Sequence, residues 1–254
     1  MIKIKTKEEI ELMKIAGRLT CQTHDYLKRH IKVGITTLEL DKLAEEFIKK
    51  HQALPSFKNY NGFPNTICAS INDEVVHGIP SNYKLKEGDI ISIDIGVNYQ
   101  GYHGDMARTY PVGNINQEKK FLLKHTKEAL YKGINQIKPG NKIGDISYAI
   151  EEYAKKHNLG VIKELVGHGV GNELHEEPEV PNYGLPNRGP LLKPGMVIAI
   201  EPMLNLGTSK ICISEDGWTI KTLDGLPSAH FEHTVLVTEE GHKILTQEGL
   251  INGK

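Results

Sequence analysis

Two segments of this chain resemble two later segments at nearly the same offset, and this internal repeat is the feature that most constrains the fold. Residues 31–51 (IKVGITTLELDKLAEEFIKKH) align without gaps on residues 137–157 (IKPGNKIGDISYAIEEYAKKH), with eight of the 21 positions identical. Further along, residues 85–94 (LKEGDIISID) align on residues 192–201 (LKPGMVIAIE). Chance similarity between two amphipathic helices is the alternative, but two matches in the same order favour a duplication.

The repeat predicts two homologous halves, about 1–110 and 111–254, within a single domain that spans residues 1–254. Each half would hold a helix pair followed by strands, and a pseudo-two-fold axis would relate the halves. The expected fold class is α+β, with a central antiparallel sheet and helices on its outer face. No linker or low-complexity segment divides the chain.

Local signals place the helices. Thr6 and Thr36 are each followed three residues later by a glutamate, the pattern of a capping box that begins a helix. A helical block is expected over residues 117–158, interrupted at 138–141 by the turn sequence KPGN. From residue 161 onward, short strands separated by glycine and proline turns are expected.

Composition sets broad limits on function. The formal net charge of −1 gives no global electrostatic signal for nucleic acid or an anionic membrane. No apolar run approaches the roughly 20 residues of a membrane span, and the first residues lack the apolar core of a signal peptide. The three widely spaced cysteines form no CxxC pair, which favours reduced thiols and a cytoplasmic location over disulfides or a thiolate zinc site.

One acidic residue stands inside an apolar run. Asp94 follows Ile90, Ile91 and Ile93, and a carboxylate removed from water costs several kcal/mol unless something compensates it. The repeat sets Asp94 opposite Glu201, and a pseudo-two-fold axis would bring the two together at the middle of the molecule. Two carboxylates at one buried point repel each other, so a shared proton or bound cations must stabilise them.

Four acids and one histidine share an apolar setting, and each acid is predicted to lie at a strand end. These residues are Asp94, Asp105, His168, Glu201 and Glu232. Taken singly, each has a structural explanation such as a turn cap, an ion pair or an exposed strand end. Together they indicate two divalent cations that neutralise the four negative charges, and a metal-assisted hydrolysis. Oxygen ligands with one imidazole suit Mn, Fe(II), Co or Zn, and the sequence does not choose among them.

Five motifs in a fixed order carry a resemblance to a known family. They are NDEVVHGIP (72–80), IDIGVNYQGYHGDMARTY (93–110), GHGVGNELHEEP (167–178), IAIEPM (198–203) and EHTVLVTEEG (232–241). The spacings agree as well, with 11 residues from Asp94 to Asp105 and 31 from Glu201 to Glu232. Over essentially its whole length the chain resembles type I methionine aminopeptidases in their short bacterial form, which have the pita-bread metallopeptidase fold.

The resemblance implies an activity and a role for each residue of the site. The enzyme would remove N-terminal methionine from nascent proteins and peptides whose second residue is small, using a hydroxide activated by two metal ions. Its five metal ligands would be Asp94, Asp105, His168, Glu201 and Glu232, with Asp105 and Glu232 bridging the ions and Asp94 bidentate on one. The catalytic residues would be His77, His175 and Glu201. His77 would contact the scissile amide, His175 would polarise its carbonyl, and Glu201 would be the general base.

A methionine pocket is also implied. Its walls would be Tyr60, Phe63, Cys68 and Trp218, with His77 and His175 as further substrate contacts, and a soft thioether suits aromatic edges and a buried thiol. The alternative for Phe63 and Cys68 is an ordinary core position. Two residues depart from the family pattern. Leu174 stands where an aromatic residue is usual, and Gly96 stands where a hydroxyl residue is common.

The implied partners are nascent polypeptides, with transient ribosome association, no membrane and no specific nucleic acid; a monomer is the family's habit.

Prolidase and aminopeptidase P share the ligand pattern but carry an extra N-terminal domain, whereas the first catalytic motif here is reached by residue 77. Type II methionine aminopeptidases have a helical insertion between the GHG and IEP motifs, where this chain has 33 residues from His168 to Glu201. A pita-bread binding protein without activity is a third alternative, which the metal content would separate from an enzyme.

Overall fold

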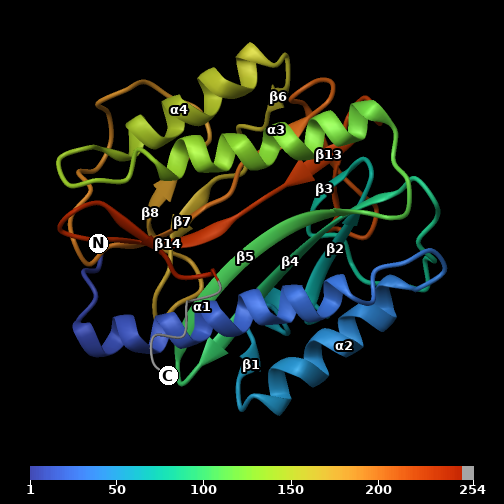
Figure 1. Cartoon of the computed structure of the whole chain (residues 1–254), viewed down its shortest axis with the longest axis horizontal. Coiled ribbons are helices and arrows are strands. Elements are labelled where there is room, and N and C mark those ends of the chain that lie inside the picture. The colour runs from blue at the N-terminus through green and yellow to red at the C-terminus, as the bar shows by residue number, and fades with distance from the viewer. Residues whose placement is uncertain (248–254) are drawn as a thin grey trace.

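The computed structural model describes residues 1–247, which form an α+β fold with two helix pairs and antiparallel sheets (Figure 1). In the view of Figure 1 the helix pairs flank the strands, α1 and α2 along one side and α3 and α4 along the other. The helices are α1 (Lys7–Lys28), α2 (Thr37–Lys50), α3 (Gln117–Ile134) and α4 (Ile143–Lys156), with a 3₁₀ turn at Tyr60–Gly62. The predicted fold class is confirmed.

The helix starts follow the local sequence signals. Thr6 and Thr36 are the N-caps of α1 and α2, and each forms the complete capping box with the glutamate three residues later. The predicted helical block is indeed interrupted, because α3 ends at Ile134 and α4 begins at Ile143. These starts are set by hydrogen bonds between residues that are close in sequence, so the sequence alone indicates them.

The strands pair antiparallel in four hydrogen-bonded sheets. The strands are β1 (Leu54–Pro55), β2 (Ile67–Ile71), β3 (Glu74–Val76), β4 (Ile90–Tyr99), β5 (Tyr102–Pro111), β6 (Gly160–Val161), β7 (Gly167–Gly169), β8 (Glu176–Val180), β9 (Val197–Ile200), β10 (Met203–Asn205), β11 (Ile211–Ile213), β12 (Ile220–Thr222), β13 (Ser228–His230), β14 (His233–Val237) and β15 (His242–Ile244). One sheet holds β1, β4, β2 and β5, and another has the order β15-β14-β9-β7-β8. The remaining two are β13-β10-β6 and β11-β12-β3.

Helix α1 lies close on β5. A Cβ added at Gly104 would come within 2.6 Å of the backbone nitrogen of Gly17, so the lack of a side chain at Gly104 lets the helix and the strand touch along their backbones. The hydroxyl of Thr20 donates to the carbonyl oxygen of Gly104 at 3.1 Å across this contact. Helix α1 therefore fixes the position of β5, the strand that carries Asp105.

Two large hydrophobic clusters form the core. One consists of residues between 19 and 112, mainly on α1, α2, β2 and β4. The other, apart from Ile90, consists of residues between 115 and 237, mainly on α3, α4, β9 and β14. This division agrees with the proposed halves, although the duplication itself stays a prediction, and residues 248–254 of the second half lie outside the described residues. Within residues 1–247, no helix is long and apolar enough to cross a membrane.

Candidate active site

Asp94 and Asp105 lie on one face of the β4–β5 hairpin. In the strand register Asp105 pairs with Gly96 and Asp94 pairs with Ala107, so the two aspartates are diagonal neighbours whose side chains share a face. The expectation that both stand at strand ends is wrong. Each lies inside a ten-residue strand, because the hairpin continues past them to its turn at Gln100 and Gly101.

Glu232 reaches the same place from the segment that joins β13 to β14. Its backbone N–H donates to the carbonyl of Ala107 at 2.9 Å. Two residues further on, the hydroxyl of Thr234 bonds to the backbone of Asp105, and two residues before, His230 bonds to the hydroxyl of Thr109. Each step of two along β5 is thus matched by a step of two back along this segment. The arrangement sets Glu232 beside Asp105.

His168 and Glu201 come from the neighbouring strands β7 and β9. His168 is the middle residue of β7, and Glu201 follows the last residue of β9 directly, as predicted. The Nδ1 of His168 lies 2.9 Å from the carbonyl oxygen of Gly169, which can only accept, so Nδ1 carries the proton and Nε2 has a free lone pair. That Nε2 lies 3.6 Å from Glu201 Oε1 and 3.9 Å from Asp105 Oδ2.

Burial and mutual repulsion raise the pKa values of the four acids. Burial, followed by the charge of Glu201, raises the pKa of Asp105 to about 8. Burial raises the pKa of Glu201 to about 8 as well. For Asp94 and Glu232, burial followed by the charge of Asp105 raises the pKa well above the usual value. Within residues 1–247, the ion-pair partners of these carboxyl groups are histidines whose own pKa is lowered by burial, so no positive charge there compensates the four acids.

These groups fit divalent cations. Asp94 Oδ1, Asp105 Oδ1 and Glu232 Oε1 are buried and have no hydrogen-bond partner among the described residues. Asp105, His168 and Glu232 each offer an atom within 4.8 Å of the others, and within residues 1–247 they are the one set of three or more such residues that meets this limit. Burial lowers the pKa of His168 to about 3, which keeps the imidazole neutral and able to bind a metal. Carboxylate oxygens with one imidazole are a ligand set for borderline divalent ions.

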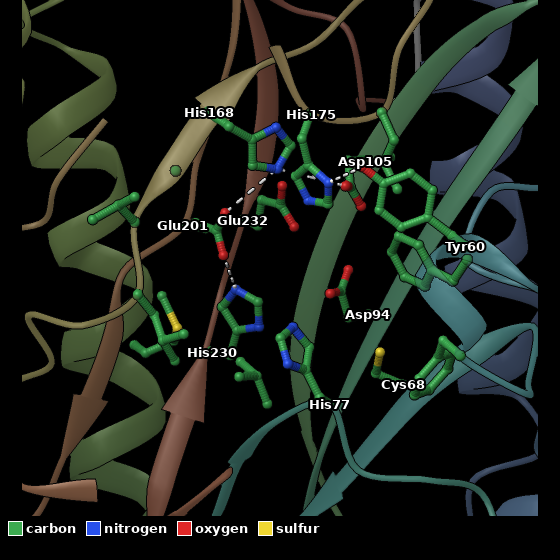
Figure 2. Close-up of a pocket in the computed structure, with 18 of the residues that line it drawn as sticks. Tyr60, Cys68, His77, Asp94, Asp105, His168, His175, Glu201, His230 and Glu232 are labelled. Carbon is green, nitrogen blue, oxygen red and sulfur yellow. Dashed lines mark hydrogen bonds and ion pairs between the residues drawn. The ribbon is translucent and has the colours of Figure 1, made fainter. Parts of the chain in front are cut away.

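Two further histidines face the same cavity, which has a volume of about 570 Å³ (Figure 2). His77 has a left-handed backbone with φ of 58°, which is uncommon outside glycine, and burial lowers its pKa to about 4. His175 precedes β8, and its Nδ1 lies 2.8 Å from the hydroxyl of Tyr60. The rings of His168 and His175 meet edge to face, with centroids 4.2 Å apart.

The predicted pocket residues also come together. Phe63, Cys68, Tyr60 and Trp218 belong to one apolar cluster, in which the rings of Phe63 and Trp218 meet edge to face at 5.3 Å. Leu174, the first departure from the family pattern, is buried in this cluster. The cluster lines one end of the cavity, next to Asp94, because Cys68 pairs with Asp94 in the β2–β4 register.

The second departure has a steric cause. A Cβ at Gly96 would come within 2.7 Å of both Phe57 and Ser56, so the space of a side chain there is already filled. The hydroxyl of Ser56 is bonded to His103 Nδ1 at 2.8 Å and so is fixed in this place. Any residue larger than glycine would have to displace two packed side chains.

The cavity contains a buried histidine that the sequence analysis does not predict as a site residue. His230 lines it, is 2% exposed, and has its Nε2 3.4 Å from Glu201 Oε2. The available cue was its position two residues before Glu232, on the same side of an extended segment. That cue is weak, because a histidine in an apolar run is more often a core residue.

Comparison with known proteins identifies a metallopeptidase family. Residues 11–239 match the profile of metallopeptidase family M24. A methionine aminopeptidase of Bacillus subtilis is 56% identical over 247 residues, which are 97% of this chain and 100% of that protein. The crystal structure of methionine aminopeptidase from Rickettsia prowazekii superposes with a TM-score of 0.96 at 45% identity, and covers 97% of this chain and 100% of that one.

A prolidase from Pyrococcus furiosus also shares the fold, but less closely. Its TM-score is 0.79 at 28% identity, and the match covers 97% of this chain but only 66% of the prolidase. The chain belongs to metallopeptidase family M24. Within this family it is similar to the methionine aminopeptidases of the short bacterial form, and the predicted resemblance is confirmed.

Proposed function

We propose that this protein is a methionine aminopeptidase, a metal-dependent hydrolase that removes N-terminal methionine from peptides and nascent proteins. The observation that carries the proposal is the cluster of four buried carboxyl groups and His168 next to an apolar, sulfur-containing pocket. The cluster needs cations, and the pocket suits an unbranched thioether side chain. Full-length similarity to methionine aminopeptidases supports the same activity.

The proposed metal site takes two divalent ions, held by Asp94, Asp105, His168, Glu201 and Glu232. Two divalent ions match four carboxylates in charge. Asp94, Asp105 and Glu232 each have a buried oxygen without a hydrogen-bond partner, and these oxygens would bind the ions. Mn, Fe(II), Co and Zn all suit this donor set. When bound, such ions make a coordinated water acidic enough to lose a proton near neutral pH.

The protein's own groups have distinct proposed roles. Glu201 takes the proton from the attacking water, since its Oε1 faces His168 across the metal site. With the Tyr60 hydroxyl donating to Nδ1, His175 keeps a proton on Nε2 and donates it toward the carbonyl oxygen as negative charge develops there. His77 lies across the cavity from His175 (Figure 2), from where it would contact the scissile amide.

The finer substrate features follow from the resemblance. We propose that Tyr60, Phe63, Cys68 and Trp218 hold the methionine side chain and that the second residue must be small, such as Gly, Ala or Ser. Nascent chains are the natural source of such N-termini, so the enzyme would act in the cytoplasm in transient contact with ribosomes.

Hydrolysis of Met-Ala-X peptides tests the proposal, with the metal-free protein assayed before and after addition of Mn²⁺, Co²⁺ or Fe²⁺. We expect release of methionine only with metal, and a kcat/KM for Met-Lys-X at least 100-fold lower than for Met-Ala-X, because steric overlap rejects a large group strongly. A protein that binds metal but cleaves neither peptide would be a binding protein instead. Equal cleavage of both peptides would remove the small second residue from the proposal.

A further inference from the structure

His230 is a buried histidine of the cavity wall to which neither the sequence motifs nor the proposed mechanism gives a role. It ends β13, is 2% exposed, and points its Nε2 at Glu201 Oε2 across 3.4 Å (Figure 2). This buried nitrogen has no hydrogen-bond partner among the described residues. A buried polar atom without a satisfied partner is costly, so its aim at the proposed general base requires an explanation.

The backbone fixes where the His230 ring stands. Its N–H donates to the hydroxyl of Thr109 at 2.9 Å, and the same hydroxyl donates to its carbonyl oxygen at 2.9 Å. The hydroxyl of Ser92 lies 2.8 Å from Thr109 on the other side and completes the chain of bonds. In β10, Met203 pairs with His230 in register. The residue is therefore attached on both sides, to the strand that carries Asp105 and to the strand that follows Glu201.

The two oxygens of Glu201 face two different imidazoles. Oε1 lies 3.6 Å from the Nε2 of His168, which has no proton because Nδ1 donates to Gly169. Oε2 lies 3.4 Å from the Nε2 of His230. An unprotonated Nε2 on His230 would set a lone pair against a carboxylate lone pair, whereas a protonated one would donate a hydrogen bond.

We propose that His230 is a positioning residue whose Nε2–H donates to Glu201 Oε2 and so keeps Oε1 directed at the metal site and the attacking water. This inference rests on the proposed function. The distance of 3.4 Å is long for a hydrogen bond, but bonds between catalytic groups often shorten only when substrate binds. Outer-shell donors of this kind commonly orient carboxylates that act at metal sites.

Direct metal binding by His230 is the competing role, and the geometry favours positioning. Of the proposed ligands, only Glu201 has a carboxylate oxygen paired with His230 Nε2, whereas His168 Nε2 is paired with oxygens of both Asp105 and Glu201. If His230 were a ligand, Glu201 Oε2 would also lose the one donor that faces it. The two roles differ in metal stoichiometry and in which ring nitrogen carries the proton.

The test compares His230→Leu, which removes the donor, with His230→Gln, whose amide can still donate. For Met-Ala-X with metal in excess, we expect His230→Leu to lower kcat by about 10–100-fold with KM within about threefold. His230→Gln should recover most of that loss. Calorimetric titration of the metal-free proteins with Mn²⁺ should give the same number of ions per chain in all three. A His230→Leu variant with wild-type kcat, or one that binds one ion fewer, would overturn the proposal.

A second measurement does not depend on peptidase activity or on the folding of a variant. The ¹⁵N chemical shifts of the histidine rings in the wild-type protein loaded with diamagnetic Zn²⁺, whose charge keeps Glu201 ionised, report which nitrogen is protonated, and His230→Leu or His230→Gln, whichever folds, identifies the signals of His230. We expect the Nε2–H form. A proton on Nδ1 with Nε2 bare would overturn the proposal even if the protein is an active aminopeptidase, and the Nε2–H form would stand even if it is not.

Discussion

The hydroxyl of Thr234 is bonded to both backbone groups of Asp105. The N–H of Asp105 donates to it at 2.9 Å, and it donates to the carbonyl oxygen of Asp105 at 2.7 Å. Thr234 belongs to β14 and Asp105 to β5, which are in different hydrogen-bonded sheets. One side chain therefore joins the two sheets at the proposed metal site, and the relative position of Asp105 and Glu232 depends on it.

Thr234→Val should destabilise the protein and loosen the metal site. Valine has the same shape but no hydroxyl, so the buried N–H and C=O of Asp105 would both lose their partner. Each unsatisfied group costs about 1–3 kcal/mol, and we expect the free energy of unfolding to fall by about 2–4 kcal/mol in urea titrations. Thr234→Ser keeps the hydroxyl and should stay within about 1 kcal/mol of wild type. Equal stability of the valine and serine variants would show that the two bonds contribute little.

Removal of metal should lower the thermal stability of the protein. In the absence of cations the four buried carboxyl groups repel each other, and Asp94, Asp105 and Glu232 each keep a buried oxygen without a partner. Metal at 100 times its dissociation constant would stabilise the folded state by about 2.7 kcal/mol, or roughly 5–10 °C in Tm for a chain of this size. Calorimetry with and without a chelator measures the difference. An unchanged Tm, with metal loss verified by elemental analysis, would contradict cation binding at this cluster.

Tyr60→Phe should weaken catalysis more than it weakens methionine binding. The ring stays in the pocket wall, but the hydroxyl that lies 2.8 Å from His175 Nδ1 is lost, so His175 is no longer held in one tautomer and orientation. We expect kcat to fall about 10-fold, the value of roughly one hydrogen bond, with KM nearly unchanged. Tyr83→Phe is the matched control, because its hydroxyl bonds to Asp89 away from the cavity. A similar loss of kcat in both variants would point to a general effect of hydroxyl removal.

The features of this fold that the sequence predicts are those set by contacts between residues close in sequence. The capping boxes of Thr6 and Thr36 involve residues three apart, and both are formed as expected. The expected end of β4 at Asp94 is wrong, because the strand continues in the hairpin with β5 and its outer half also pairs with β1, from a distant part of the sequence. Leu54 pairs with Asn98 there, and no local pattern in residues 94–99 reveals that partner.

The candidate site divides in the same way. The acids were found because a carboxylate in an apolar run is unusual wherever the chain goes, and the repeat linked Asp94 to Glu201. The sequence does not predict the hydrogen bonds that fix the backbone around these acids. Thr109 and Thr234 are common residues in strands, and their bonds to His230 and Asp105 exist only because β5 lies beside the segment from β13 to β14.

His24 should make the protein sensitive to mild acid. It is buried in α1 and donates from Nε2 to the carbonyl oxygen of Met106 at 2.8 Å, while Nδ1 lies 3.1 Å from the hydroxyl of Tyr110. Burial, followed by the charge of Arg108, lowers its pKa from 6.5 to about 3. Between these values the unfolded chain binds a proton that the folded protein does not, so stability is complete above pH 6.5 and falls as the pH drops toward 3.

The expected loss from this residue is about 1.4 kcal/mol per pH unit, or about 2 kcal/mol between pH 6.5 and 5. Urea titrations of wild type and His24→Gln, both with chelator present, measure it. Glutamine can keep the bonds to Met106 and Tyr110 but does not titrate, so its stability should fall less over this range. Other buried histidines respond to acid with the same sign in both proteins, and the difference isolates His24. Parallel curves would show that His24 does not contribute.

Glu201→Gln should abolish most of the activity and leave substrate binding intact. Glutamine keeps the size of the side chain and one oxygen that can bind metal, but it cannot take a proton from the attacking water. Loss of a general base typically costs two to four decades, so we expect kcat for Met-Ala-X to fall by roughly 10²–10⁴-fold. The pocket of Tyr60, Cys68 and Trp218 is untouched, so KM should change far less.

Glu179→Gln is the matched control. Glu179 is an exposed acid that lines the same cavity, and its substitution by glutamine removes one negative charge, as Glu201→Gln does. Its kcat should stay within about threefold of wild type. Elemental analysis must accompany the kinetics, since an ion lost from Glu201→Gln would lower kcat for a different reason. If the variant holds as many ions as wild type and its kcat remains near wild type, Glu201 is not the base, and the proton must leave the water by another route. If kcat falls while the metal and KM are kept, the carboxylate of Glu201 itself accepts the proton from the attacking water.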